Sequence, residues 1–77
     1  MHRAIVLIST ELATEYKVRQ ELRKLPYVRE ASVVAGVYDI VARVEAETMD
    51  ELKEIIFYKL RKVENVRSTN SMICAHE

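Results

Sequence analysis

The sequence predicts an α+β domain with the element order βαββαβ. Two observations favour this order: short apolar runs alternate with segments whose apolar residues recur at helical spacing, and the chain repeats itself. Residues 22–29 (LRKLPYVR) return as residues 60–67 (LRKVENVR), and each copy joins the end of a helix to the start of a strand. The chain therefore consists of two similar strand–helix–strand halves.

The first half begins with a strand over residues 4–8, an unbroken apolar run (AIVLI). A helix follows, and one of its faces carries Thr14, Val18, Leu22 and Leu25. Pro26 disfavours helical geometry at the residue before it and so ends this helix. Residues 28–35 then resume an extended pattern, which gives the second strand.

The second half begins with a strand over residues 40–46, in which alternate positions share one face, as in a half-buried strand. Thr48 and Glu51 form a capping box, in which the threonine oxygen accepts from the third helical N–H and the glutamate reaches back. The helix that they start carries a buried stripe made of Leu52, Ile55, Ile56, Leu60 and Val63. Residues 66–75 supply the last strand.

Right-handed crossovers in both halves place the two helices on one face of a four-stranded antiparallel sheet, the ferredoxin-like arrangement. The opposite face has no helix, yet residues 5–8 are apolar on both sides of the central first strand. Val41 and either Met72 or Ile73 add to the uncovered face. We therefore predict that two copies pack sheet against sheet as a dimeric α/β sandwich, with a monomer that exposes a partly apolar sheet as the alternative.

Size and composition limit the function further. The 77 residues form one domain, residues 1–77, and a chain this short buries only roughly 60% of its unfolded surface. Twelve basic and twelve acidic residues give a formal charge of +0, which argues against direct contact with nucleic acid. No apolar run approaches the ~18 residues of a membrane span, and the N-terminus lacks a signal-peptide cleavage region. The single cysteine, Cys74, excludes an internal disulfide, so we expect a cytoplasmic protein.

The only glycine, Gly36, lies between two β-branched runs and predicts a tight turn between the second and third strands. Such a turn exposes backbone N–H groups, and Asp39 adds a carboxylate close by. Donors and an acceptor then meet at the rim of the sheet, as a small zwitterion requires. A plain hairpin turn with a solvated aspartate is the alternative.

A polar cluster, residues 68–71 (STNS), occupies the last strand where apolar residues are expected. Its hydroxyls and amide can hydrogen-bond a bound amino acid, and a polar, solvent-facing start of a strand is the alternative. His2 and His76 lie at the chain ends, near Cys74 and Glu77, but they match no compact ligand spacing, so no metal is expected. No nucleophile has a histidine partner implied by spacing and no Gly-rich phosphate loop exists, so no catalytic residue and no cofactor are expected.

The segments GVYDI (residues 36–40) and VRSTNSMI (residues 66–73), joined to the βαββαβ pattern, resemble the C-terminal effector-binding domain (RAM domain) of the Lrp/AsnC transcription regulators. The resemblance spans essentially the whole chain. It implies that sheets pair into dimers, that dimers commonly associate into rings, and that amino acid effectors bind between neighbouring dimers. The turn would cradle the effector, with its backbone N–H groups facing the carboxylate and Asp39 facing the ammonium group, and the last strand would complete the pocket. The ligand-binding residues thus implied are Gly36, Val37, Tyr38, Asp39, Thr69, Asn70 and Ser71.

Full-length relatives in this family carry an N-terminal helix-turn-helix domain, whereas this chain begins at the first strand of the sheet. The resemblance therefore implies a stand-alone sensing and oligomerisation module for transcription regulation, which joins or competes within assemblies of full-length Lrp/AsnC regulators. Two other functions stay open. One is a small dimeric ferredoxin-like enzyme, monooxygenase- or isomerase-like, which needs a titratable group in a cavity between helices and sheet. The other is a purely structural adaptor.

Overall fold

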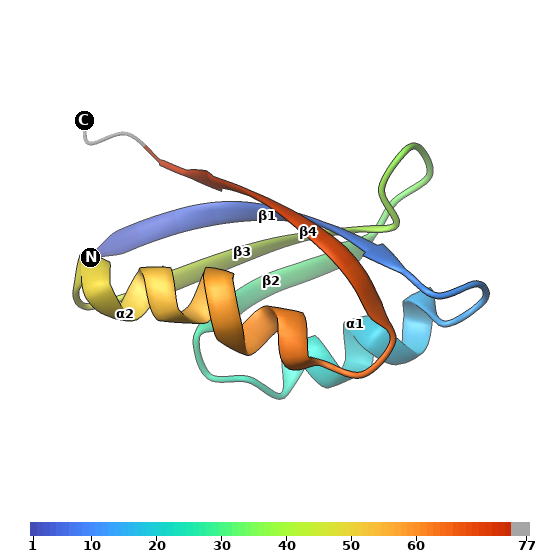
Figure 1. Cartoon of the computed structure of the whole chain (residues 1–77), viewed down its shortest axis with the longest axis horizontal. Helices are drawn as coiled ribbons and strands as arrows, with labels where there is room; N and C mark the ends of the chain where they lie inside the picture. Colours follow the sequence, from blue (N-terminus) through green and yellow to red (C-terminus); the bar gives the residue numbers. More distant parts are fainter. Residues whose placement is uncertain (75–77) are drawn as a thin grey trace.

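Four strands and two helices follow one another along the chain in the predicted order (Figure 1). This arrangement is seen in a computed structural model, which describes residues 1–74. The strands are β1 (His2–Thr10), β2 (Val28–Val33), β3 (Ile40–Ala46) and β4 (Val66–Ile73). The helices are α1 (Glu15–Arg23) and α2 (Met49–Glu54), and α2 continues through a π-helical stretch, η1 (Ile55–Lys59), into a 3-10 turn, η2 (Leu60–Lys62).

The strands form one antiparallel sheet in the order β2-β3-β1-β4, and both helices cover the same face of it, as the ferredoxin-like prediction requires (Figure 1). The predicted bounds of three strands differ from the structure. β1 extends two residues beyond each end of the predicted residues 4–8. β2 ends at Val33 rather than at residue 35, because residues 34–39 form the loop that leads to β3. β4 ends at Ile73, and residue 75, the end of the predicted strand, lies outside the described residues.

Aliphatic side chains fill the layer between the sheet and the helices. The fully or almost fully buried residues of the central strands and the helices are Ala4, Val6, Ile8, Val18, Leu22, Ile40, Ala42, Val44, Leu52, Ile55, Ile56 and Leu60. Each large member of this set stabilises the fold by about 1.5–3 kcal/mol relative to an exposed side chain. Thr10 is the one polar residue buried within the described part of the chain. The helix face of the sheet is therefore a filled core.

The second helical segment begins as the sequence predicts. The Glu51 N–H donates to the Thr48 hydroxyl at 3.1 Å, and the Thr48 N–H donates to the Glu51 carboxylate at 3.2 Å, which completes the capping box. The predicted stripe from Leu52 to Leu60 is buried, and Val63 packs against its edge. The π-helical stretch was not predicted: the Leu60 N–H bonds to the Ile55 carbonyl, five residues earlier.

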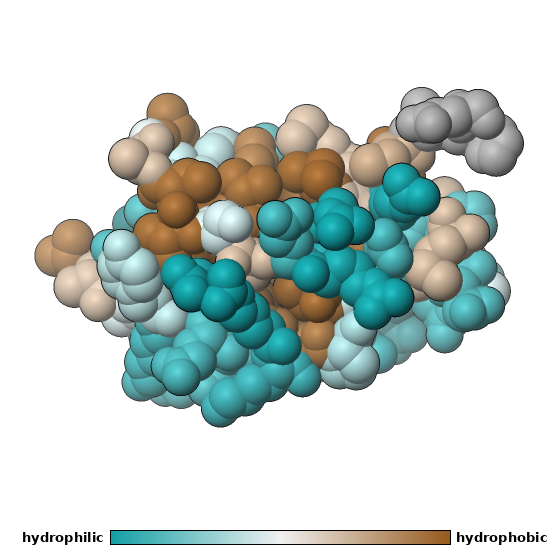
Figure 2. All heavy atoms as spheres, turned by 180° about the vertical axis from the view of Figure 1, so that it is seen from behind, coloured by the Kyte–Doolittle hydropathy of each residue, from teal (hydrophilic) through white to brown (hydrophobic). Residues whose placement is uncertain are grey.

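The other face of the sheet carries no helix and is called the open face below. Ile5 pairs with Met72 across β1 and β4, and Leu7 pairs with Val41 across β1 and β3, so these four side chains form an apolar strip on the open face. Met72 and not Ile73 belongs to this strip, because Ile73 pairs with the buried Ala4 on the helix face. Figure 2 shows apolar surface running beside a dense group of hydrophilic side chains on one side of the molecule.

Candidate functional site

The loop over residues 34–39 connects β2 to β3 and contains the predicted turn. Gly36 has a φ of +151°, a conformation that residues with a Cβ rarely adopt, although open space surrounds the position that a Cβ would occupy. The Val34 N–H donates to the Asp39 carbonyl at 2.9 Å and closes the base of the loop. Val37, at the tip, is 91% exposed. The connection is thus longer than the tight turn expected, and its glycine is needed because the backbone has a positive φ there.

Asp39 fixes this loop against the end of β1. Its N–H donates to the Ile8 carbonyl at 2.9 Å, and its carboxylate Oδ2 accepts from the Thr10 N–H at 2.8 Å. A hydrogen bond to an ionised acceptor is roughly twice as strong as a neutral one. Asp39 therefore holds the loop against β1, and we call this pair of hydrogen bonds the Asp39 latch. The sequence alone did not suggest this role, because Thr10 lies 29 positions away.

Tyr38 and Asn70 connect the loop to β4. The Asn70 side-chain amide Nδ2 donates to the Tyr38 hydroxyl at 3.2 Å, and Asn70 pairs with Leu7 on the open face. The structure thereby brings together one residue from each of the two predicted binding segments. Their contact with an effector stays a prediction.

Thr69 and Ser71 do not share a face with Asn70. They pair with Ile8 and Val6, which point toward the helices, because side chains alternate between the faces of a strand. The predicted residues of β4 are therefore divided: Asn70 lies with Tyr38 on the open face, and the two hydroxyl residues lie on the helix side. Their role in ligand binding stays a prediction too.

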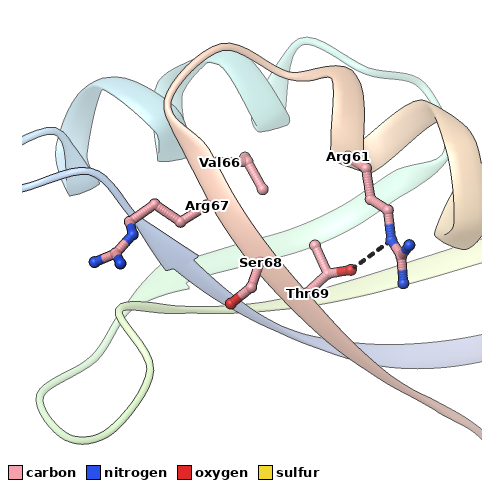
Figure 3. A pocket seen from close by; sticks show the side chains of 5 residues that line it. All are labelled: Arg61, Val66, Arg67, Ser68 and Thr69. Carbon is pink, nitrogen blue, oxygen red and sulfur yellow. Dashed lines mark hydrogen bonds between the residues drawn. The ribbon is translucent and has the colours of Figure 1, made fainter.

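A hollow of about 280 Å³ lies between β4 and η2 (Figure 3). It is lined by Arg61, Val66, Arg67, Ser68 and Thr69. Arg61 Nε donates to the Thr69 hydroxyl at 3.3 Å, and these two side chains point toward each other, whereas Arg67 points away (Figure 3). Arg61 was not among the predicted site residues. No signal in the sequence pairs it with Thr69, eight positions away, because this contact forms only when η2 packs beside β4.

A second hollow, of about 310 Å³, lies between α2–η1 and the segment that leads into β2. Four glutamates line it together with Lys59, whose Nζ lies 5.5 Å from the centre of the Tyr27 ring; they are Glu45, Glu47, Glu51 and Glu54. Burial raises the pKa of the Tyr27 phenol. None of the predicted binding residues lines this hollow.

A charged cluster lies at one end of the open face, and Glu45 is its centre. The Glu45 carboxylate is 3.0 Å from Arg43 Nη1, 3.2 Å from Arg29 Nε and 3.6 Å from Arg3 Nε, and Arg43 Nε is also 3.6 Å from Glu30. The hydrogen bond from Arg29 and the positive charges of Arg29, Arg43 and Arg3 hold the pKa of the Glu45 carboxyl below its usual value, against a smaller opposing effect of burial. The sequence analysis missed this cluster, since three strands contribute to it.

Residues 1–74 contain no group of three or more histidine, cysteine, aspartate or glutamate side chains that could hold a metal ion. His76 and Glu77 lie outside the described residues. No helix in the described part of the chain is long and apolar enough to cross a membrane.

Comparisons with known proteins identify the chain's relatives. The family model described as "Lrp/AsnC ligand binding domain" matches residues 3–77. An uncharacterized HTH-type transcriptional regulator of Pyrococcus abyssi is 36% identical over 70 residues, which are 91% of this chain and 44% of the regulator. A related regulator of Pyrococcus furiosus is 35% identical over 78% of this chain and 40% of its own length. This chain thus spans less than half the length of these curated relatives.

Solved structures show the same similarity. The hypothetical protein PHS023 from Pyrococcus horikoshii is 36% identical with a TM-score of 0.91, and the match covers 100% of this chain and 93% of that one. The protein TTHA0845 from Thermus thermophilus is 27% identical with a TM-score of 0.89, covering 100% and 96% of the two chains. AsnC of E. coli, at 22% identity and a TM-score of 0.87, has the same fold over 99% of this chain and 52% of its own.

Proposed function

Because the chain belongs to the Lrp/AsnC ligand-binding domain family and is a regulatory effector-binding domain, we propose that its effector is an amino acid and that it assembles through its open face. The single observation that carries the proposal is the contact between Tyr38 and Asn70, at 3.2 Å, which unites the two segments that resemble the family's effector site. The Asp39 latch supports it further, since a loop held against β1 before a ligand arrives loses less entropy on binding.

The division of the β4 residues supports a site between copies of the chain. Asn70 lies on the open face with Tyr38, whereas Thr69 and Ser71 lie on the helix side. A site formed between two copies can bring both sets of side chains to one ligand, because one copy contributes its loop and the neighbouring copy contributes its β4.

The apolar strip supports assembly into a dimer. In the single chain Met72 is 50% exposed, and it adjoins Ile5 and Leu7 on a face that no helix covers. A contiguous apolar patch of this kind marks an interaction surface, and a twofold dimer presents the same patch from both copies. Larger rings of such dimers are part of the proposal.

We also propose that other polypeptides make the contact with DNA, namely the full-length regulators that this chain would join in the cytoplasm. The formal charge of +0 supports this division, because binding to DNA relies on an excess of basic residues. Both helices of the described residues pack on the sheet, and their apolar faces are buried there.

Isothermal titration of the intact chain with each of the twenty amino acids tests the proposed function, with light scattering of the same samples. We expect heat from one amino acid or a small chemically related group, together with a change in assembly size. The proposal is wrong if no amino acid gives heat and the assembly size never changes.

A further inference from the structure

Among residues 1–74, three arginines pair with glutamates, and Arg61 alone of the other four makes a side-chain hydrogen bond. Arg3, Arg29 and Arg43 are all within 3.6 Å of glutamate oxygens in the cluster around Glu45. Arg61 has no carboxylate within ion-pair distance among residues 1–74, and its one hydrogen bond there goes from Nε to the Thr69 hydroxyl. Its two terminal nitrogens carry donor groups that no described side chain or carbonyl accepts.

The surroundings of Arg61 have the size and polarity of a small-ligand site. The hollow beside it measures about 280 Å³, and it lies at β4, an edge strand that pairs only with β1 in the described sheet. Backbone N–H and C=O groups on the outer side of an edge strand have no ladder partner. A guanidinium, a hydroxyl and such backbone groups together can receive both charged groups of a zwitterion.

We propose that Arg61 is the carboxylate-binding residue of the effector site, assisted by the Thr69 hydroxyl. The inference rests on the proposed function and deepens it by assigning the ligand's carboxylate to Arg61, in place of the backbone N–H groups of the turn that the family resemblance implies. A guanidinium binds a carboxylate through two parallel N–H donors, which a lysine cannot do. The Thr69 hydroxyl accepts from Arg61 Nε and keeps its own proton to donate to the same carboxylate.

The position of Arg67 restricts the ligand class. Arg67 also borders the hollow, but its side chain points away from Arg61 and Thr69 (Figure 3). A single guanidinium therefore faces the ligand, which suits the one negative charge of a carboxylate better than the two charges of a phosphate monoester. Thr69 places this carboxylate subsite beside the β4 residues already predicted to bind.

Calorimetric titration of three intact chains tests the inference: wild type, Arg61→Gln and the matched control Arg67→Gln. The probes are the amino acid that gives the largest heat, its amide, which lacks the carboxylate, and its 2-oxo acid, which lacks the ammonium group. If no amino acid gives heat, pyruvate and acetate take their place. We expect Arg61→Gln to weaken binding of the carboxylate compounds roughly 10- to 100-fold and Arg67→Gln to change it less than about twofold.

The outcomes separate this inference from the proposed function. Amino acid binding that Arg61→Gln leaves unchanged, or an amide that binds as well as its acid, overturns the role of Arg61 and leaves the amino acid effector in place. Binding of pyruvate or acetate that requires Arg61, without binding of any amino acid, supports the carboxylate subsite and refutes the amino acid effector. If no carboxylate compound binds, both are wrong. Unchanged circular dichroism of the variants shows that each loss is local, since Arg61 is exposed.

Discussion

The two faces of the sheet share the strand β1, but different surroundings cover its side chains on each face. On the helix face, Ala4, Val6 and Ile8 of β1 are fully buried by this chain's own helices. On the open face, Ile5 and Leu7 alternate with them along the same strand but remain partly accessible. The hydrophobic effect is the same for both sets, so the difference lies in what covers them. One face is completed by the chain itself, and we expect the other to be completed by a second copy.

Truncating one leucine on each face gives the largest expected effect and tests this difference. Leu60 is fully buried beneath the sheet, so Leu60→Ala should cost about 2–5 kcal/mol of unfolding free energy at any protein concentration. Leu7→Ala on the open face should cost less in dilute solution and more as the protein concentration rises, because dimer formation stabilises the folded chain. Urea unfolding at several concentrations measures both. Equal and concentration-independent losses would remove the distinction between the faces.

Placing a charge on the open face tests what covers it. We expect Leu7→Glu to weaken the dimer by about 100-fold or more, because an unpaired carboxylate buried between two sheets is costly. The matched control is Leu12→Glu, since Leu12 is 95% exposed in the loop after β1 and belongs to neither face. Sedimentation equilibrium measures both dissociation constants. A Leu7→Glu chain that dimerises like the wild type would show that another surface joins the copies.

Two variants of Asp39 can separate the structural role of this residue from its proposed role in binding the effector. Asp39→Ala removes the acceptor for the buried end of β1 at Thr10 and should cost about 1–3 kcal/mol of stability as well as effector affinity. Asp39→Asn keeps an oxygen that can accept from the Thr10 N–H but removes the negative charge that would face an ammonium group. We expect this variant to lose affinity while keeping most of the stability.

Thermal unfolding and calorimetric titration of the two Asp39 variants give both quantities. Unchanged amino acid affinity in Asp39→Asn would restrict Asp39 to its structural role. An equal loss of stability in the two variants would instead show that charge, and not only an acceptor atom, holds the loop.

Much of the fold could be predicted from sequence because its signals are local. The capping box at Thr48 and the helix end at Pro26 depend on neighbouring residues alone, and the repeat of residues 22–29 places both crossovers. The π-helical stretch has no such local signal, since its hydrogen bonds shift to suit packing on the sheet. The choice between Met72 and Ile73 needed the register of β4 against β1, which one strand's pattern does not contain.

The candidate site was less predictable because its contacts join distant parts of the chain. The glycine and the polar segment of β4 are visible in the sequence, yet the Asp39 latch spans 29 positions and the contact of Tyr38 with Asn70 spans 32. Period-two alternation alone implies that Thr69 and Asn70 face opposite ways, but it does not say which of them lies with the loop. The contact of Arg61 with Thr69 follows only from the packing of η2 against β4.

The smallest expected effect concerns pH, and it arises on the open face because no titratable side chain is buried in the helix-face core of the described residues. Arginines, Arg29 first, hold the pKa of Glu45 below its usual value of 4.5 in the folded chain. The cluster therefore stabilises the fold above pH 4.5, and this contribution is lost as pH falls below 4.5 through the folded-state pKa. Glu45→Gln should lower the urea midpoint slightly at pH 7 and have less effect at an acidic pH below the folded-state pKa, where the wild-type carboxyl is protonated. A Glu45→Gln effect that is equally large at both pH values would show that packing at this position, rather than the ionised carboxylate among its arginines, stabilises that end of the open face.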